Sequence, residues 1–258
     1  MPTWVRRCCA LTTLAAACGA ALGVQLVDEP RSLGWSAAEV AGAASLQQTV
    51  SQAEAAGALG CAQYCRRLAR IFASLLDQAR EQSAHAAQLP WALTVVRLPD
   101  VAAFSLPDGQ VVISESLIDD RDLSDEALAF VLAHEMAHSI LEHERQLLTV
   151  GRLLLPRQVD RSVRDMYVEF AHNFGLLKTL EPVLHQGEFE ADELGLLLAA
   201  LAGYAPRRQI EFMQNEVAED DLRRPVSATH PPPLERLERL QSLLPLAVRL
   251  HERSGHAN

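Results

Sequence analysis

Two histidines and a glutamate near the middle of the chain have the types and spacing of a metal-dependent hydrolase site. His134, Glu135 and His138 form the pattern His-Glu-x-x-His, inside a run over residues 124–149 whose apolar pattern predicts a helix throughout. Residues four apart lie on one helix face, so both imidazoles can bind one metal ion while the glutamate reaches a water molecule beside it. Zinc peptidases use this arrangement: the metal polarises a carbonyl group and the carboxylate takes a proton from water.

The sequence around the motif argues against a solvent-exposed helix face. A pattern of five residues also arises by chance, and a helix that carries His and Glu is often exposed. Here the motif lies between apolar stretches, and the small Ala133 and Ala137 would let a neighbouring helix pack closely. We therefore expect the histidines to point inward and to hold one zinc ion per chain.

A zinc site needs at least three protein ligands, so a third donor must come from elsewhere in the chain. Glu188 and Asp192 lie one turn apart on a helix predicted for residues 188–201, so one can bind the metal while the other orients a ligand histidine. Glu190 projects from a different face of that helix, and His185 also competes. Spacing alone leaves Glu188, Glu190 and His185 open as the third ligand.

The composition predicts a single, mainly helical domain. The chain has 258 residues, 49% hydrophobic but only 5% aromatic, and Leu and Ala dominate, which favours helices over sheets. The formal net charge of −10, without a Lys/Arg cluster, argues against a nucleic-acid partner.

Two short segments rich in β-branched residues interrupt the helical pattern. Residues 91–96 and 110–114 flank a turn-like stretch at 106–109. They predict a small antiparallel sheet of two or three strands beside the motif helix, and the fold class is therefore α+β, mainly α-helical.

Three further helices are predicted around this centre. Residues 59–83 form an amphipathic pattern, residues 158–180 a helix bracketed by Pro156 and Pro182, and residues 234–244 a polar helix. The role of residues 150–186 is open: they could cover the cleft, contact a membrane, form a subunit interface or simply pack.

The N-terminus has the pattern of an export signal. Arg6 and Arg7 precede a short apolar, small-residue run that ends at Gly23. Cleavage could follow Gly23 or precede Cys18, whose context is an imperfect lipoprotein box, and an uncleaved anchor is the third alternative.

Three segments follow from this reading. Residues 1–23 are a signal peptide or lipoprotein signal, residues 24–58 an irregular lead-in, and residues 59–258 the functional domain. Cys61 and Cys65 lie beyond the signal, and the sequence does not decide whether they form a disulfide, since the geometry is poor across one turn of regular helix.

Several short motifs, taken in order, resemble a family of zinc metallopeptidases, the gluzincins that include the HtpX heat-shock protease, the CAAX prenyl proteases and the periplasmic proteases BepA and LoiP. The resemblance covers roughly residues 65–240. The matching motifs are Ala-Ala-Phe-Ser-Leu-Pro-Asp-Gly at 102–109, the segment 132–138 around His-Glu-x-x-His, Glu188-x-x-Ala191-Asp192-x-x-Gly195, Ala-Gly-Tyr at 202–204, and Thr-His-Pro at 229–231 followed by Arg236.

The resemblance implies a zincin-like metalloprotease domain and gives roles to residues that spacing left open. Glu188 becomes the third zinc ligand beside His134 and His138, and Asp192 the carboxylate that orients a ligand histidine. Glu135 becomes the catalytic base.

The same resemblance implies how substrate and transition state are bound. Val111, Val112, Ile113 and Ser114 correspond to an edge strand that takes up substrate as an added β-strand. His230 corresponds to a histidine that approaches the zinc, as an inhibitory fourth ligand or as a donor to the oxyanion. Tyr204 is the other candidate donor.

We expect a zinc-dependent endopeptidase of the cell envelope, closest in style to BepA and LoiP, that cleaves misfolded or damaged envelope proteins. It would act in the periplasm or on the periplasmic face of a membrane, with Cys18 as the candidate lipid-bearing residue. The alternative is a latent, zinc-loaded, chaperone-like binding protein that His230 inhibits. Expected partners are unfolded or damaged polypeptides and, through the N-terminus, a membrane.

Overall fold

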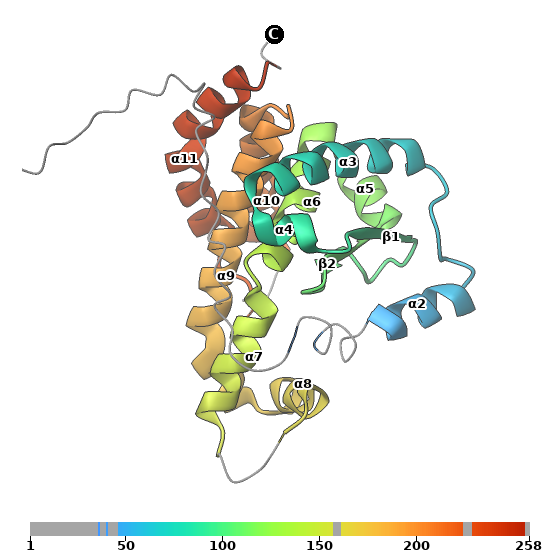
Figure 1. Ribbon diagram of the computed structural model, residues 1–258, viewed down its shortest axis with the longest axis vertical. Helices are drawn as coiled ribbons and strands as arrows, with labels where there is room; N and C mark the ends of the chain where they lie inside the picture. The colour runs from blue at the N-terminus through green and yellow to red at the C-terminus, as the bar shows by residue number, and fades with distance from the viewer. Residues whose placement is uncertain (1–35, 37–39, 41–45, 157–160, 224–228, 256–258) are drawn as a thin grey trace, which may run out of the picture.

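The computed structural model describes residues 36, 40, 46–156, 161–223 and 229–255, so the signal predicted for residues 1–23 lies outside it. The described part is mainly helical with one small sheet, which confirms the predicted fold class (Figure 1). In none of its helices is the apolar stretch long enough to span a membrane. The elements, in chain order, are α2 (Leu46–Ala55), α3 (Cys65–Gln82), α4 (Ala84–Gln88), β1 (Ala92–Val96), β2 (Ala103–Ser105), β3 (Gln110–Ser114), α5 (Glu115–Arg121), α6 (Asp125–Ile140), α7 (His143–Leu154), α8 (Val163–His172), α9 (Phe174–Leu201), α10 (Pro206–Arg223) and α11 (Pro233–Arg253).

The sheet is mixed, and the prediction of an antiparallel sheet was wrong for one of its two strand pairs. Its order is β1-β3-β2: β2 and β3 form an antiparallel hairpin, whereas β1 runs parallel to β3. A parallel pair needs a connection of about a dozen residues. Residues 97–109 supply that length, and β2 is the return strand inside the connection.

The central strand alternates between two apolar layers. Val111 and Ile113 face the main core, whereas Val112 faces the smaller cluster with Ala53 of α2 and Val96. In Figure 1, α3 and α2 accordingly lie on opposite sides of the sheet.

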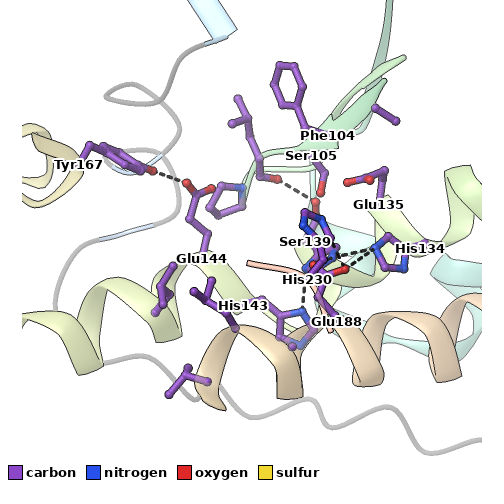
Figure 2. Close-up of a pocket in the computed structure, with 18 of the residues that line it drawn as sticks. Phe104, Ser105, His134, Glu135, Ser139, His143, Glu144, Tyr167, Glu188 and His230 are labelled. Atoms are coloured by element: carbon purple, nitrogen blue, oxygen red, sulfur yellow. Dashed lines mark hydrogen bonds and ion pairs between the residues drawn. The ribbon is translucent and has the colours of Figure 1, made fainter. Parts of the chain in front are cut away.

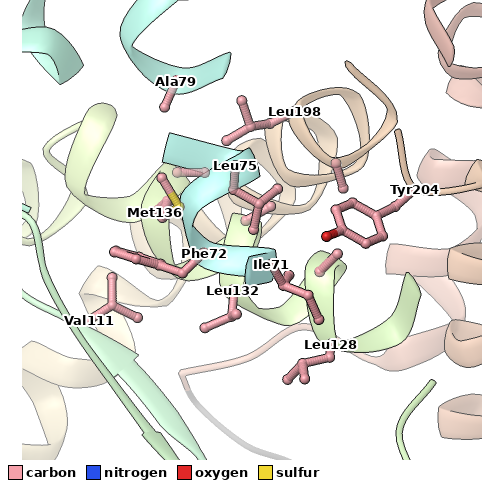
Figure 3. Close-up of a cluster of buried hydrophobic side chains, with 14 of the residues drawn as sticks. Ile71, Phe72, Leu75, Ala79, Val111, Leu128, Leu132, Met136, Leu198 and Tyr204 are labelled. Carbon is pink, nitrogen blue, oxygen red and sulfur yellow. The ribbon is translucent and has the colours of Figure 1, made fainter. Parts of the chain in front are cut away.

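The main core joins α3, the sheet, α6 and α9. Ile71, Phe72 and Leu75 on one face of α3 pack toward Leu132 and Met136 of α6 (Figure 3). Burying each of these large side chains contributes about 1.5–3 kcal/mol, so this layer fixes the position of the motif helix.

Helices α6 and α9 are in close backbone contact at a glycine of α9. A Cβ atom placed on Gly195 would lie 3.0 Å from the backbone nitrogen of His134 and 3.1 Å from its Cα. A side chain at this position would push the two backbones apart, and its absence lets the helix that carries Glu188 pack against the helix that carries His134.

The predicted continuous helix over residues 124–149 is divided in two. Ser124 caps α6 by accepting a hydrogen bond from the Ala127 amide, but α6 ends at Ile140. Glu142 then adopts a left-handed conformation (φ 57°, ψ 34°) before α7 begins at His143.

The predicted helix over residues 158–180 was also wrong. Within the described residues, this stretch contains α8 and the first part of α9, which begins at Phe174 and continues through Pro182. A proline inside a helix removes one hydrogen bond and bends the helix but need not end it.

The C-terminal helices α10 and α11 pack with α9 to form the other large core. Leu196 of α9, Met213 of α10 and Leu240 of α11 are among its members. Helix α11 extends beyond the predicted residues 234–244, past Pro245 to Arg253.

Cys61 and Cys65 form a disulfide. Cys61 precedes α3 and only Cys65 is helical, so the objection that applies to a regular helical turn does not arise. The loop before α3, which contains Cys61, is also hydrogen-bonded to α5. The carboxylate of Glu115 accepts hydrogen bonds from the backbone amides of Ala62, Gln63 and Tyr64 at 2.8–2.9 Å.

Candidate zinc site

The two motif histidines point from α6 to one place, as their spacing predicts. The Nε2 atoms of His134 and His138 are 3.0 Å apart, and the rings meet edge to face. His134 is buried, whereas His138 is partly open to the cleft. Two imidazole nitrogens therefore face a common point at the base of the cleft.

Glu188 of α9 supplies a carboxylate at the same point. Its Oε2 lies 3.6 Å from His134 Nε2, and its Oε1 lies 3.4 Å from His138 Nε2. The ligand atoms of these three residues all lie within 4.8 Å of one another. Glu190 and His185, the alternatives left open by spacing, take no part in this cluster of described residues.

The three residues fit a zinc ion. Two imidazoles and a carboxylate are the donor set of catalytic zinc sites, which leave another position for water or substrate. Glu188 Oε2 is buried and, among the described residues, accepts no hydrogen bond. A buried acceptor without a donor is costly, and a cation at this point would satisfy it.

Asp192 lies one turn beyond Glu188, behind the cluster. Its Oδ1 is 3.0 Å from His134 Nδ1, and the guanidinium of Arg236 donates two hydrogen bonds of 2.7 Å to the carboxylate. This places Asp192 where the resemblance implied, oriented toward a candidate ligand histidine. The part played by Arg236 was missed, because no sequence pattern shows that α11 brings it to α9.

Opposing charges set the protonation of the cluster. Burial would raise the pKa of Glu188, but the hydrogen bond from His138 and the charge of His134 lower it well below its usual value. Burial would lower the pKa of His134, but the hydrogen bond to Asp192 and the neighbouring carboxylates raise it. Burial also works against ionised Asp192, and Arg236 reverses that effect and lowers the pKa of this carboxyl group.

A cleft of about 1000 Å³ opens in front of the cluster, and Glu135 lines it beside His134 and His138 (Figure 2). On the far side, the cleft is lined by Tyr167 of α8, whose hydroxyl donates a hydrogen bond to Glu144. Arg164 of α8 also lines this side. Part of the stretch 150–186, whose role the sequence left open, therefore forms a wall of the cleft.

His230 is at the site and Tyr204 is not. His230 Nε2 lies 3.7 Å from Glu188 Oε2, and the side chain is 56% exposed at the cleft. Tyr204 is buried in the main core, and its hydroxyl is 3.1 Å from Ser74 Oγ of α3 (Figure 3). The prediction that Tyr204 could donate to an oxyanion was wrong, because the left-handed turn at Gly203 directs it toward α3 instead.

The predicted substrate-binding edge strand was also wrong. Strand β3 is central, with a partner on each side, and its residues Val111, Val112, Ile113 and Ser114 are buried. Ser114 instead caps α5 and exchanges hydrogen bonds with the backbone of Leu98. The edge strand at the cleft is β2, and residues 103–107 line the cavity.

A buried His-Glu-x-x-His helix, completed by a glutamate from a second helix beside a small sheet, is the arrangement of a gluzincin-type zinc metallopeptidase. Residues 63–244 match the model described as "Peptidase family M48". This match spans more than half of the chain, and the chain belongs to that family.

Known relatives agree with this assignment. The mitochondrial metalloendopeptidase OMA1 of Schizosaccharomyces pombe is 30% identical over 166 residues, which cover 62% of this chain and 48% of that protein. The OMA1 proteins of Bos taurus and Homo sapiens are 30% and 29% identical over 190 and 189 residues, each match covering 64% of this chain and 34% of the relative. The chain thus spans about half, or less, of the length of these relatives. They support the family-level resemblance without singling out the periplasmic proteases.

Proposed function

We propose that this protein is a zinc-dependent endopeptidase that cleaves misfolded or damaged polypeptides. The observation that carries the proposal is the convergence of His134, His138 and Glu188 at the base of a cleft that Glu135 also lines. Membership of peptidase family M48 and likeness to proteins described as metalloendopeptidases support it.

Each residue of the site would have a separate role in peptide hydrolysis. His134, His138 and Glu188 would hold zinc, which supplies a Lewis acid for the scissile carbonyl and lowers the pKa of a water molecule. Glu135 takes the proton of the attacking water and delivers it to the leaving amine. Asp192, held by Arg236, keeps the His134 ring in orientation.

Zinc content and casein cleavage by the purified full chain test this function. We expect about one zinc per chain, cleavage that is lost on metal removal, and recovery on adding zinc. Glu135→Gln should keep the zinc and lose at least about a hundredfold in activity, whereas Glu81→Gln, an exposed control on α3, should match the wild type. Full activity in zinc-loaded Glu135→Gln protein would refute the role of Glu135.

A latent, binding-only protein is the second candidate, and the position of His230 favours it. The ring stands near Glu188 on the side of the cluster that substrate must reach. If His230 inhibits the enzyme, His230→Ala should raise casein cleavage above the wild type at equal zinc content. Lower cleavage would instead support a role as an oxyanion donor.

We place the protein outside the cytosol, in the periplasm or on the periplasmic face of a membrane, where damaged envelope proteins would be its substrates. The basic and apolar residues 1–23 support export, and the disulfide between Cys61 and Cys65 is consistent with an oxidising compartment. Cell fractionation and N-terminal analysis of the mature chain test this location. The N-terminus of the mature chain differs among the three alternatives: it follows Gly23 after signal cleavage, is an acylated Cys18 in a lipoprotein, and is unchanged if the anchor stays uncleaved. Recovery of unprocessed protein in the cytosol would contradict the proposal.

A further inference from the structure

His143, the first residue of α7, contacts a candidate zinc ligand from behind. Its Nδ1 lies 2.9 Å from His138 Nδ1, and its Nε2 lies 3.3 Å from Glu190 Oε2. The two imidazole rings meet edge to face, with centroids 4.9 Å apart. The three side chains thus form a continuous line of polar contacts that leads away from the cluster.

The break between α6 and α7 makes this contact. In an unbroken helix, residues five apart point about 140° away from each other, so His138 and His143 could not meet. The left-handed conformation of Glu142 redirects the chain and returns His143 to the face that carries His138. This conformation is unfavourable for a residue with a side chain and persists where the surrounding structure stabilises it.

The hydrogen-bond directions are consistent along the line. His138 Nε2 faces His134 and Glu188, so it must be unprotonated to bind a metal, and the proton of the neutral ring then lies on Nδ1. That N–H donates to His143 Nδ1. The proton of neutral His143 is then on Nε2, which donates to the carboxylate of Glu190.

The surroundings restrict His143 to this arrangement. Its side chain is only 10% exposed, and its ring lies against the backbone of α9 at Gly187, where an added Cβ would be 3.4 Å from the ring. The side-chain amide of Gln186 in turn donates a hydrogen bond of 3.0 Å to Oε1 of Glu190. The ring therefore has few alternative orientations.

We propose that His143 is a positioning residue that holds the His138 ring with Nε2 toward the zinc, and that Glu190 keeps His143 in the required tautomer. The inference rests on the proposed function, because it assumes that His138 binds the metal. It gives each ligand histidine its own partner: Asp192 orients His134, and His143 orients His138. It also gives Glu190, a rejected candidate ligand, a role in the same site.

Zinc affinity, measured by competition with a chromophoric chelator, tests the proposal without relying on activity. His143→Leu removes the acceptor but keeps an apolar side chain, and should weaken zinc binding about ten- to a hundredfold. His143→Asn retains a short acceptor for His138 and should restore most of that loss. Glu190→Gln should weaken zinc binding less than His143→Leu does. The glutamine oxygen can still accept the hydrogen bond from His143, and the side chain of Glu190 is partly exposed in the wild type. His172→Leu, an exposed histidine on α8, is the control and should bind zinc like the wild type.

Two further measurements separate positioning from packing. The visible spectrum of the Co²⁺-loaded protein should change in His143→Leu and return toward the wild type in His143→Asn. Chemical unfolding of the metal-free proteins shows whether each variant is folded. Wild-type zinc affinity in folded His143→Leu, or equally weak binding in His143→Asn and His143→Leu, would overturn the proposal. A wild-type chain that binds no zinc would instead refute the proposed function, before any variant is compared.

Discussion

At the scale of single residues, the buried pair of Asp192 and Arg236 supports the site most directly. Asp192 is 1% exposed, and both of its oxygens bond to the guanidinium of Arg236. Removing one partner from a buried ion pair leaves the other charge without compensation, which costs far more than removing a pair at the surface.

We therefore predict that Asp192→Asn destabilises the metal-free protein by about 3–5 kcal/mol. Zinc affinity should also fall about ten- to a hundredfold, because the partner of His134 Nδ1 is altered. Urea unfolding and chelator competition measure the two effects.

The matched control is an exposed pair. Arg208 and Glu211 are bonded at 2.8 Å, but both side chains are more than half exposed. Arg208→Ala should change stability by less than about 1 kcal/mol. Equal losses in Asp192→Asn and Arg208→Ala would show that burial of the pair does not matter.

The sequence predicted the residues whose spacing lies within one helix. His134 and His138 are four apart, and Glu188 and Asp192 are four apart, so helical geometry alone places each pair. His143 could not be found this way, because its contact depends on a left-handed residue that breaks the helix. Arg236 could not be given a role, because its contact with Asp192 depends on the packing of α11 against α9.

At the scale of elements, the contact between α6 and α9 determines the distance between the histidines and Glu188. Gly195→Ala would place a methyl group about 3 Å from the backbone of His134. We predict a loss of about 1–3 kcal/mol of stability, as for other overpacked cores. Zinc affinity should fall as well, because the strain is relieved by moving α9, which carries Glu188.

Gly175→Ala in the same helix is the control for this prediction. Gly175 is exposed and helical, and the nearest atom to an added Cβ is 3.6 Å away. Alanine is the better helix former by up to about 1 kcal/mol, so stability should be unchanged or slightly higher. If the Gly195→Ala protein is as stable as the Gly175→Ala protein, helices α6 and α9 can move apart without a loss of stability, and the prediction is wrong.

The loop before α3 is stabilised by a buried carboxylate, which predicts a pH dependence. Burial would raise the pKa of Glu115, but hydrogen bonds from the amides of Tyr64, Ala62 and Gln63 outweigh it and lower the pKa. A lowered pKa in the folded state means that the carboxylate stabilises the fold above its unfolded pKa of about 4.3, and that this contribution is lost as the pH falls below it.

Glu115→Gln should therefore cost about 1–3 kcal/mol at pH 7, and the difference from the wild type should shrink as the pH falls below about 4. Urea unfolding of both proteins across this pH range measures it. Glu238→Gln, an exposed position on α11, is the control and should change stability at pH 7 by no more than about 0.5 kcal/mol. A gap between wild type and Glu115→Gln that stays constant down to low pH would contradict the assigned cause.

The sheet shows which element-level features the sequence left undetermined. The β-branched runs placed β1 and β3 correctly, but their pairing depends on where the chain between them returns. The three-residue β2 was too short to distinguish by composition. Because β2 takes the outer position, the strand that faces the cleft could not be assigned before the topology was known.

At the scale of the whole molecule, the cleft lies between β2 on one side and α7, α8 and α9 on the other, with the cluster at its base. An extended polypeptide could add to β2 as a further strand and cross the cluster. In an antiparallel pair, amides point alternately toward and away from the partner strand. Leu106 N–H donates to Gln110 and Ala102 accepts from Ser114, so the N–H of Ser105 points away from β3.

This geometry gives a prediction for substrate binding. Ser105→Pro removes an outward N–H without breaking the bonds between β2 and β3, since proline is tolerated on an edge strand. Losing one backbone hydrogen bond to substrate should lower kcat/KM about tenfold, mainly through KM. Ser105→Ala keeps the N–H and should match the wild type, and zinc affinity should be equal in all three proteins because Ser105 is not among the ligands. If Ser105→Pro cleaves casein as well as Ser105→Ala does, substrate does not bind along β2, and the cleft must receive it from the wall formed by α7 and α8.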